Sequence, residues 1–238
     1  MRFCPAGLLY WEPCQAGNRA ALTIAVDACG GAELRTDWDS PGVGHCVHPG
    51  ALLPTYNQMK ALLIIDMIVR DVKKRSDRKS LISSQLKLIL AFKKAKQKII
   101  LAGGDKSGKP SKHVNPVMLR LWGHEESKNP KENKVIPELL NSYYDYYINK
   151  KGYSAFFKTK LESICKKEKI KEIYLAGIYS GVCVYFSAAD AAMRGILPIL
   201  VTDASGAPNK KLHKLNISRY TDILGPAITT NKVLKKLH

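Results

Sequence analysis

The sequence predicts an α/β protein, a Rossmann-like doubly wound parallel sheet of about six strands with helices on both faces. Short apolar runs of strand length recur along residues 59–238. Between them lie segments whose apolar residues repeat at helical spacing. Strands that alternate with helices form right-handed βαβ crossovers, and these crossovers produce a parallel sheet that is covered on both faces.

The expected elements follow one another from Met59 to the end of the chain. Strands are predicted at 60–66, 98–102, 146–148, 172–176, 197–202 and 227–229. Helices are predicted at 80–96, 155–168 and 181–194, within 210–223, and at the C-terminus. In such sheets, ligands bind beyond the carboxyl ends of the strands. The residues just after each strand are therefore the first candidates for chemistry.

Residues 1–58 differ from the rest in composition. They contain no lysine and have a charge balance of −2, whereas residues 59–238 hold 35 basic and 15 acidic residues, a balance of +20. Glycine and proline clusters flank the one apolar run, 20–26, which fits a strand or a short helix. We therefore expect residues 1–58 to be a poorly structured N-terminal extension, which can lie outside the natural product. The competing interpretation is a genuine small N-terminal module. A chain that begins at Met59 is expected to fold without it.

The formal net charge of +18 suggests either an anionic partner or solvated lysine-rich helix faces. The lysines come in scattered pairs, without a basic arm, zinc-finger spacing or an aromatic RNA-binding motif, which favours the second interpretation. An anionic small substrate stays compatible with this charge. No apolar run approaches the roughly 20 residues of a membrane helix. We expect a small-molecule substrate, with neither nucleic acid nor membrane as partner.

The cysteine pattern predicts a reduced, cytoplasmic protein without disulfides. The six cysteines form no C-x-x-C pair, so a zinc site of the usual spacing is not expected. Met1 to Trp11 lacks the basic and apolar regions of a signal peptide. Disulfides persist mainly in oxidising compartments, and nothing in the sequence points to one.

Three side chains that can perform hydrolytic chemistry lie at predicted strand ends. Cys183 opens a helix, where unpaired amides and the helix dipole lower a thiol's pKa, favour thiolate and can bind an oxyanion. Asp66 ends the first strand and can shuttle the thiol proton to a leaving amine. Lys150 follows the third strand and would stabilise the thiolate. Each also has a plainer interpretation. Cys183 can be a small packing residue, Asp66 can cap the following loop, and Lys150 can be a solvated charge.

Several motifs, in order along residues 59–238, resemble the isochorismatase-like cysteine hydrolases, a superfamily that includes nicotinamidases, ureidoacrylate and carbamoyl-group hydrolases, and isochorismatase. The matching segments are Ala61–Met67 (ALLIIDM), Val135–Leu139, Lys150–Phe156 (K-x-x-Y-S-A-F), Gly177–Val184 with Ala188–Ala191 and Gly195, and Val201–Ala204. The resemblance implies a catalytic triad of Asp66, Lys150 and Cys183. The lysine stands three residues before the aromatic, which selects Lys150 over its neighbour Lys151.

The resemblance has further implications for the nucleophile turn and the assembly. It implies an oxyanion hole formed by the amides of Tyr179 and Cys183, and a cis peptide between Ile178 and Tyr179. It also implies a homodimer or homotetramer. Cys165, on another predicted helix, is expected to serve packing only.

Two departures from the family pattern bear on the pocket. Relatives often carry Asp-Met-Gln where this chain has Asp66-Met67-Ile68, which puts the polarity of the pocket in doubt. The nicotinamidase branch binds a metal through Asp-x-His, where this chain reads Asp105-Lys106-Ser107. His113 and His124 lie downstream, but catalytic zinc sites usually keep three protein ligands. We expect no metal and no cofactor, with Asp105 capping its loop or joining Trp122 and Tyr153 in the substrate pocket.

The sequence thus predicts a cysteine hydrolase that acts on a small amide, carbamoyl or ureido compound through a covalent acyl-enzyme on Cys183. One alternative is a nicotinamidase with an altered metal site. Another is a catalytically degenerate member that acts as a binding protein. The sequence does not identify the substrate.

Overall fold

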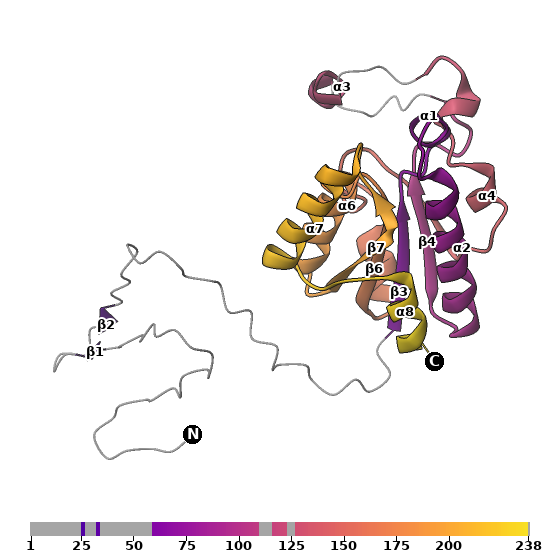
Figure 1. The fold of residues 1–238 in the computed structure, drawn as a ribbon. Coiled ribbons are helices and arrows are strands. Elements are labelled where there is room, and N and C mark those ends of the chain that lie inside the picture. Colours follow the sequence, from indigo (N-terminus) through magenta and orange to yellow (C-terminus); the bar gives the residue numbers. More distant parts are fainter. Residues whose placement is uncertain (1–24, 27–31, 34–58, 110–115, 123–126, 238) are drawn as a thin grey trace. The chain divides into compact units, whose positions relative to one another are not determined.

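The computed structural model describes residues 25–26, 32–33, 59–109, 116–122 and 127–237 (Figure 1). The chain divides into two units, Met1–His48 and Pro49–His238. In the first unit, strands β1 (Ala25–Val26) and β2 (Ala32–Glu33) pair antiparallel, and β1 falls at the end of the apolar run 20–26. That residues 1–58 are dispensable stays a prediction.

The second unit contains a six-stranded sheet in which the described strands are all parallel, so the predicted fold class is confirmed. Its strands are β3 (Met59–Ile65), β4 (Lys98–Gly103), β5 (Tyr146–Asn149), β6 (Ile170–Ile178), β7 (Leu197–Gly206) and β8 (Ala227–Ile228). Their order across the sheet is β5-β4-β3-β6-β7-β8. From β3, the chain adds β4 and β5 on one side and then β6, β7 and β8 on the other. The switch point therefore lies between β3 and β6, and doubly wound folds bind ligands at such a point.

Helices cover both faces of this sheet. They are α1 (Val69–Val72), α2 (Arg78–Lys94), α3 (Pro116–Trp122), α4 (Pro137–Leu140), α5 (Leu161–Lys167), α6 (Cys183–Ala192), α7 (Lys210–Ile223) and α8 (Thr230–Leu237), with a 3₁₀ turn, η1, at Pro130–Asn133. In Figure 1, α6 and α7 lie on one side of the sheet and α2 and α8 on the other. The short α1, α3, α4 and η1 were not predicted, because these segments are too short for a helical repeat to show in the sequence.

Alternation along the central strand β3 explains the two hydrophobic cores. Successive side chains of a strand point to opposite faces. Leu62 and Ile64 therefore pack in one core with buried residues of α2 and α8. Ala61, Leu63 and Ile65 pack in the other core with residues of α5, α6 and α7.

One predicted helix begins later than expected. The helix predicted at 155–168 is α5, which begins at Leu161. Lys158 has φ +51°, and a residue in the left-handed region cannot continue a right-handed helix. The Thr159 hydroxyl donates to the Ala155 carbonyl at 2.6 Å and accepts from the Leu161 amide at 3.2 Å, which stabilises the turn that precedes the helix.

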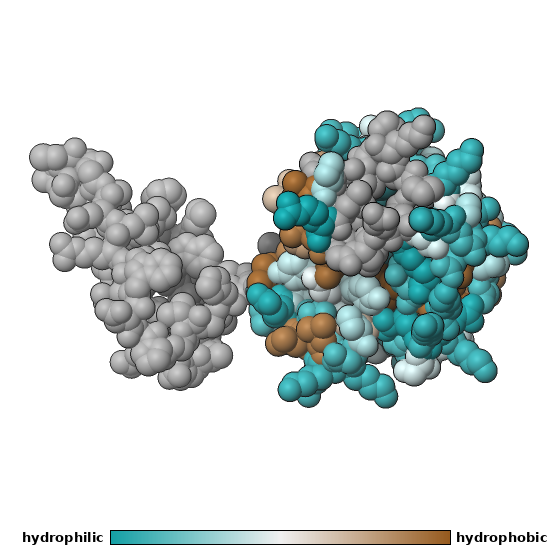
Figure 2. All heavy atoms as spheres, turned by 90° about the horizontal axis from the view of Figure 1, so that it is seen from above, coloured by the Kyte–Doolittle hydropathy of each residue, from teal (hydrophilic) through white to brown (hydrophobic). Residues whose placement is uncertain are grey.

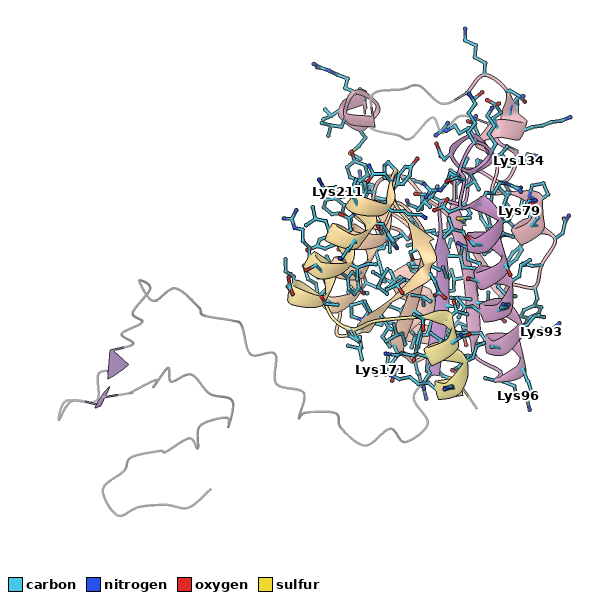
Figure 3. All side chains as sticks on the ribbon, viewed as in Figure 1. Lys79, Lys93, Lys96, Lys134, Lys171 and Lys211 are labelled. Atoms are coloured by element: carbon cyan, nitrogen blue, oxygen red, sulfur yellow. The ribbon has the colours of Figure 1, made fainter. Side chains whose placement is uncertain are left out.

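The lysine-rich surface agrees with the solvated-face interpretation of the net charge. The labelled lysines in Figure 3 (Lys79, Lys93, Lys96, Lys134, Lys171 and Lys211) extend outward from several different elements. Figure 2 shows the molecule from above, and most of its coloured surface is hydrophilic, with smaller hydrophobic patches. Among the described residues, the search for a helix long and apolar enough to cross a membrane found none.

Gly177 lets β6 approach β3 closely at the switch point. It has φ +115°, and a Cβ built there would lie 2.0 Å from the Ile65 carbonyl oxygen. Gly195 also has a positive φ, +70°, but a Cβ there would meet nothing within 4 Å. The two glycines therefore separate the cost of the backbone conformation from the cost of the steric clash.

We expect Gly177→Ala to lower the free energy of unfolding by about 2–5 kcal/mol, since a clash with backbone adds to the conformational strain. Gly195→Ala should cost only about 1–2 kcal/mol, because strain acts alone there. Urea denaturation of both variants measures the difference. Equal losses would mean that β6 can move away from β3 without penalty.

Candidate active site

Asp66 lies at the carboxyl end of β3, beside the switch point. Its amide donates to the Ala102 carbonyl at 2.8 Å, which continues the β3–β4 pairing by one residue. Its φ is +51°, a left-handed conformation that aspartate adopts more readily than most residues. The strand therefore stops there, and only 16% of the side chain is exposed.

Lys150 directly follows β5, and its amide donates to the Gly103 carbonyl at 2.7 Å. Its Nζ donates to Oδ2 of Asp66 in an ion pair, and only 7% of the residue is exposed. Burial has the largest single effect on the pKa of Lys150 and lowers it, but the charge and hydrogen bond of Asp66, together with the interactions with Cys183, outweigh burial, so the pKa is raised. The ammonium therefore stays charged. This position distinguishes Lys150 from its neighbour Lys151.

Cys183 is the first residue of α6, and its side chain is half-buried against the second core. Burial raises the pKa of the thiol to about 12, although the charge of Lys150 opposes it; the charge of Asp66 acts in the same direction as burial. This direction is opposite to the one expected from the helix terminus and the ammonium, because burial opposes both. A raised pKa favours the thiol form, for which attack requires a base.

The raised pKa predicts a characteristic alkylation profile for Cys183. Only the thiolate reacts, so the rate should rise about tenfold per pH unit from pH 7 to pH 10, without a plateau. Iodoacetamide labelling, followed by mass analysis of the peptide that contains Cys183, measures this rate. A plateau near neutral pH would contradict the raised pKa of Cys183 and would show that the thiolate is present in the free protein.

The side chains of Asp66, Lys150 and Cys183 thus meet at the carboxyl end of the sheet, where the sequence predicted them. Asp66 and Lys150 are in contact, and both act electrostatically on the thiol. That they form a catalytic triad stays a proposal.

The turn before Cys183 contains the predicted cis peptide between Ile178 and Tyr179, which is confirmed. The Tyr179 carbonyl accepts from the amides of Val182 and Val184, at 2.9 and 3.3 Å. Among the described residues, we find no backbone acceptor for the amides of Tyr179 and Cys183. Two donors are therefore left near the thiol, as an oxyanion hole requires.

Ser187 connects the nucleophile helix to the segment that follows Lys150. Its hydroxyl is buried, donates to the Cys183 carbonyl at 2.7 Å and accepts from the Ala155 amide at 2.9 Å. One side chain thereby fixes two pieces of the site relative to each other. No motif or spacing in the sequence indicated this role.

We expect Ser187→Ala to lower the free energy of unfolding by about 1–3 kcal/mol, because it leaves the buried Ala155 amide without an acceptor. Ser163→Ala, at an exposed position of α5, is the matched control and should change it by less than about 0.5 kcal/mol. Chemical denaturation measures both. Equal effects would contradict the assigned contact.

The predicted pocket residues differ in their surroundings. Asp105 accepts from the Ser107 amide at 2.7 Å and from the side chains of Ser107 and Asn149, and the hydrogen bonds from Ser107 lower its pKa. It therefore caps its own loop, the first of its two predicted roles.

Tyr153 stacks on Phe186 of α6, with ring centroids 5.4 Å apart. Trp122 ends α3, but its side chain lies outside the described residues. For Asp105, Tyr153 and Trp122, contact with substrate stays a prediction.

Of the residues considered for a nicotinamidase-type metal, Asp105 lies in the described part of the chain, where its carboxylate accepts hydrogen bonds from Ser107 and Asn149. Within the described residues, no group of three or more His, Cys, Asp or Glu side chains is placed to hold an ion. His113 and His124 lie outside them. That no metal is bound stays a prediction.

Arg75 lies beside the nucleophile turn, and sequence reasoning missed it. Its guanidinium carbon is 5.8 Å from the centre of the Tyr179 ring. It forms an ion pair with Asp77 at 2.7 Å and donates to the Ala207 carbonyl at 2.8 Å. Arg75 was one of 35 basic residues in this part of the chain, so no local pattern distinguished it.

A cavity of about 340 Å³ lies away from this site, at the amino ends of β6 and β7. Cys165 lines it, 3% exposed, and burial raises the pKa of this thiol to about 11. The structure thus places Cys165 far from the three clustered side chains in the fold, among apolar residues of α5 and β6.

Comparison with known proteins agrees with this geometry. A family model described as the isochorismatase domain matches residues 60–232. Enterobactin synthase component B from Escherichia coli (strain K12) is 27% identical over 114 residues, which cover 48% of this chain and 40% of that protein. The chain thus spans less than half the length of this relative.

Solved structures share the fold. N-carbamoylsarcosine amidase from Thermoplasma acidophilum has a TM-score of 0.62 and 24% identity, covering 73% of this chain and 98% of its own. Nicotinamidase from Bacillus subtilis has a TM-score of 0.61 and 19% identity, covering 72% and 99%. The family model covers most of the second unit, and the chain therefore belongs to the isochorismatase domain family.

Proposed function

We propose that the protein is a cysteine hydrolase that cleaves the C–N bond of a small amide, carbamoyl or ureido compound. The observation that carries this proposal is the buried Lys150–Asp66 ion pair beside Cys183 at the switch point of the sheet. A nucleophile, a proton acceptor and a fixed cation together are the parts that acyl transfer requires.

The resting thiol sets the order of the steps. Asp66 takes the proton from the Cys183 thiol as the sulfur attacks the substrate carbonyl, so the S–C bond forms without a pre-formed thiolate. The amides of Tyr179 and Cys183 stabilise the oxyanion of the tetrahedral intermediate. Lys150 keeps its charge throughout and stabilises the negative charge as it passes from the carboxylate, through the attacking sulfur, to the oxyanion.

Collapse of this intermediate breaks the C–N bond, and Asp66 returns its proton to the departing amine. An acyl group is then held on Cys183 as a thioester. Asp66, again a carboxylate, takes a proton from water as the water attacks the thioester. Release of the acid restores the thiol, and protons balance over the cycle.

The names of two structural neighbours, an N-carbamoylsarcosine amidase and a nicotinamidase, support C–N cleavage as the reaction class. Nicotinamide belongs in the test as a separate candidate. The sequence Asp105-Lys106-Ser107 lacks the histidine of the nicotinamidase metal motif, which argues against a metal-dependent form of that activity.

A panel of primary amides, N-carbamoyl amino acids, ureido acids and nicotinamide, assayed for ammonia release, tests the proposal. We expect turnover of at least one class by the full-length protein and none by the Cys183→Ala variant. Metal analysis of the active protein accompanies the assay. Ammonia release that tracks bound metal and survives Cys183→Ala would overturn the cysteine mechanism. No turnover in any class would favour the binding-protein alternative.

A further inference from the structure

Helix α7 holds the nucleophile turn through one buried serine. Ser180 lies three residues before Cys183 and is fully buried. Its Oγ is 3.0 Å from Nδ1 of His213 and 3.2 Å from Nδ2 of Asn216, both on α7. The two helix residues stand three positions apart, so they share one face of α7.

The hydrogen bonds define the direction of this network. Nε2 of His213 lies 3.0 Å from the Thr202 carbonyl, which only accepts, so Nε2 carries the proton. With the proton on Nε2, Nδ1 is the acceptor, and the Ser180 hydroxyl donates to it. The Asn216 amide donates in turn to Ser180 Oγ. Each residue in the series Asn216, Ser180, His213 therefore donates one hydrogen bond to the next acceptor, and the series ends at the Thr202 carbonyl.

The same helix covers the next residue of the turn. A Cβ built on Gly181 would lie 2.5 to 2.6 Å from the amide group of Asn216. The Ser180 amide donates to the Gly206 carbonyl at 2.8 Å, so the end of β7 fixes the other side of the turn. The path of the chain into Cys183 is thus set by β7 and α7 together.

We propose that His213 and Asn216 are positioning residues, which aim Cys183 and the amides of its turn through Ser180. Neither residue needs to touch the substrate. A displacement of about 1 Å at the reacting atoms can cost on the order of 10²-fold in rate. The effect on turnover rests on the proposed function, whereas the effect on the thiol's accessibility does not.

The choice of variants separates the two contacts of the histidine. His213→Ala removes both contacts. His213→Asn keeps an amide oxygen near the place of Nδ1, as acceptor for Ser180, and His213→Gln keeps an amide N–H near the place of Nε2, as donor to Thr202. Asn216→Ala tests the other helix residue. Lys211→Ala, at an exposed lysine of α7 that points outward in Figure 3, is the matched control.

We expect His213→Ala to lower kcat by about 10- to 100-fold and to leave KM within about twofold, since the turn rather than the binding surface is disturbed. His213→Asn should recover more of kcat than His213→Gln. Iodoacetamide labelling of Cys183 should become several-fold faster in His213→Ala and Asn216→Ala, because the turn loosens around a buried thiol. Cys165, read in the same samples, should label at an unchanged rate.

Three results would overturn the proposal. One is unchanged labelling of Cys183 in both alanine variants. Another is equal acceleration of Cys183 and Cys165, which would show that the whole domain has been destabilised. The third is equal kcat in the Ala, Asn and Gln variants. Turnover by the Cys183→Ala variant would contradict the proposed function. It would not affect the labelling test, because iodoacetamide labelling of Cys183 needs no substrate.

Discussion

Replacing Cys183 with alanine should lower kcat/KM on the order of 10⁴-fold or more, because among the described residues Cys183 is the nucleophile assigned beside Asp66 and Lys150. Only the sulfur is removed, and the residue is half-buried at the first position of a helix. The fold should therefore survive. Ammonia release and a thermal melt of the same preparation measure the two quantities.

Cys165→Ala is the matched control, since Cys165 is the other cysteine among the described residues. It packs in the second core, away from the clustered side chains, so truncation should lower stability while turnover stays within about twofold. Equal loss of activity in the two variants would indicate that stability, and not a nucleophile, explains the Cys183 result.

Asp66→Asn should lower kcat by about 10²- to 10⁴-fold, because the amide keeps the shape of the carboxylate but takes no proton from the thiol. It should also destabilise the fold by about 3–5 kcal/mol, since it leaves the buried Lys150 charge unpaired. Without the charge of Asp66, the largest effect on Lys150 is burial, which lowers its pKa. Stability of this variant should therefore rise with pH as the lysine becomes neutral.

The double variant Asp66→Asn/Lys150→Met separates the two losses. Removing the unpaired charge should recover most of the stability without any recovery of turnover. Steady-state assays and chemical denaturation of the single and double variants give the comparison. Recovery of both quantities together would mean that Asp66 acts only as a structural partner of Lys150.

The fold followed from the sequence because buried parallel strands have a simple signature. Ala61–Ile65 and Ile99–Ala102 are continuous apolar runs, and the structure buries them in β3 and β4. The late start of α5 was not predictable from periodicity, because one left-handed residue, Lys158, decides it.

The meeting of the three site residues was predictable because parallel strands bring their carboxyl ends to one edge. The protonation state of Cys183 was not, because it depends on desolvation, which the sequence does not contain. The contacts of Ser180 with α7 were also missed. His213 and Asn216 lie more than thirty positions from the turn, and only the fold brings them together.

Hydroxylamine partitioning tests the central claim, a covalent acyl-enzyme on Cys183, most directly. Two substrates that share one acyl group but carry different amines are hydrolysed in the presence of hydroxylamine, and the ratio of hydroxamate to acid is measured. Because both substrates pass through the same thioester, we predict the same ratio for both, whatever their individual rates. Ratios that differ with the leaving amine would show that water attacks the substrate directly, and would contradict the covalent mechanism.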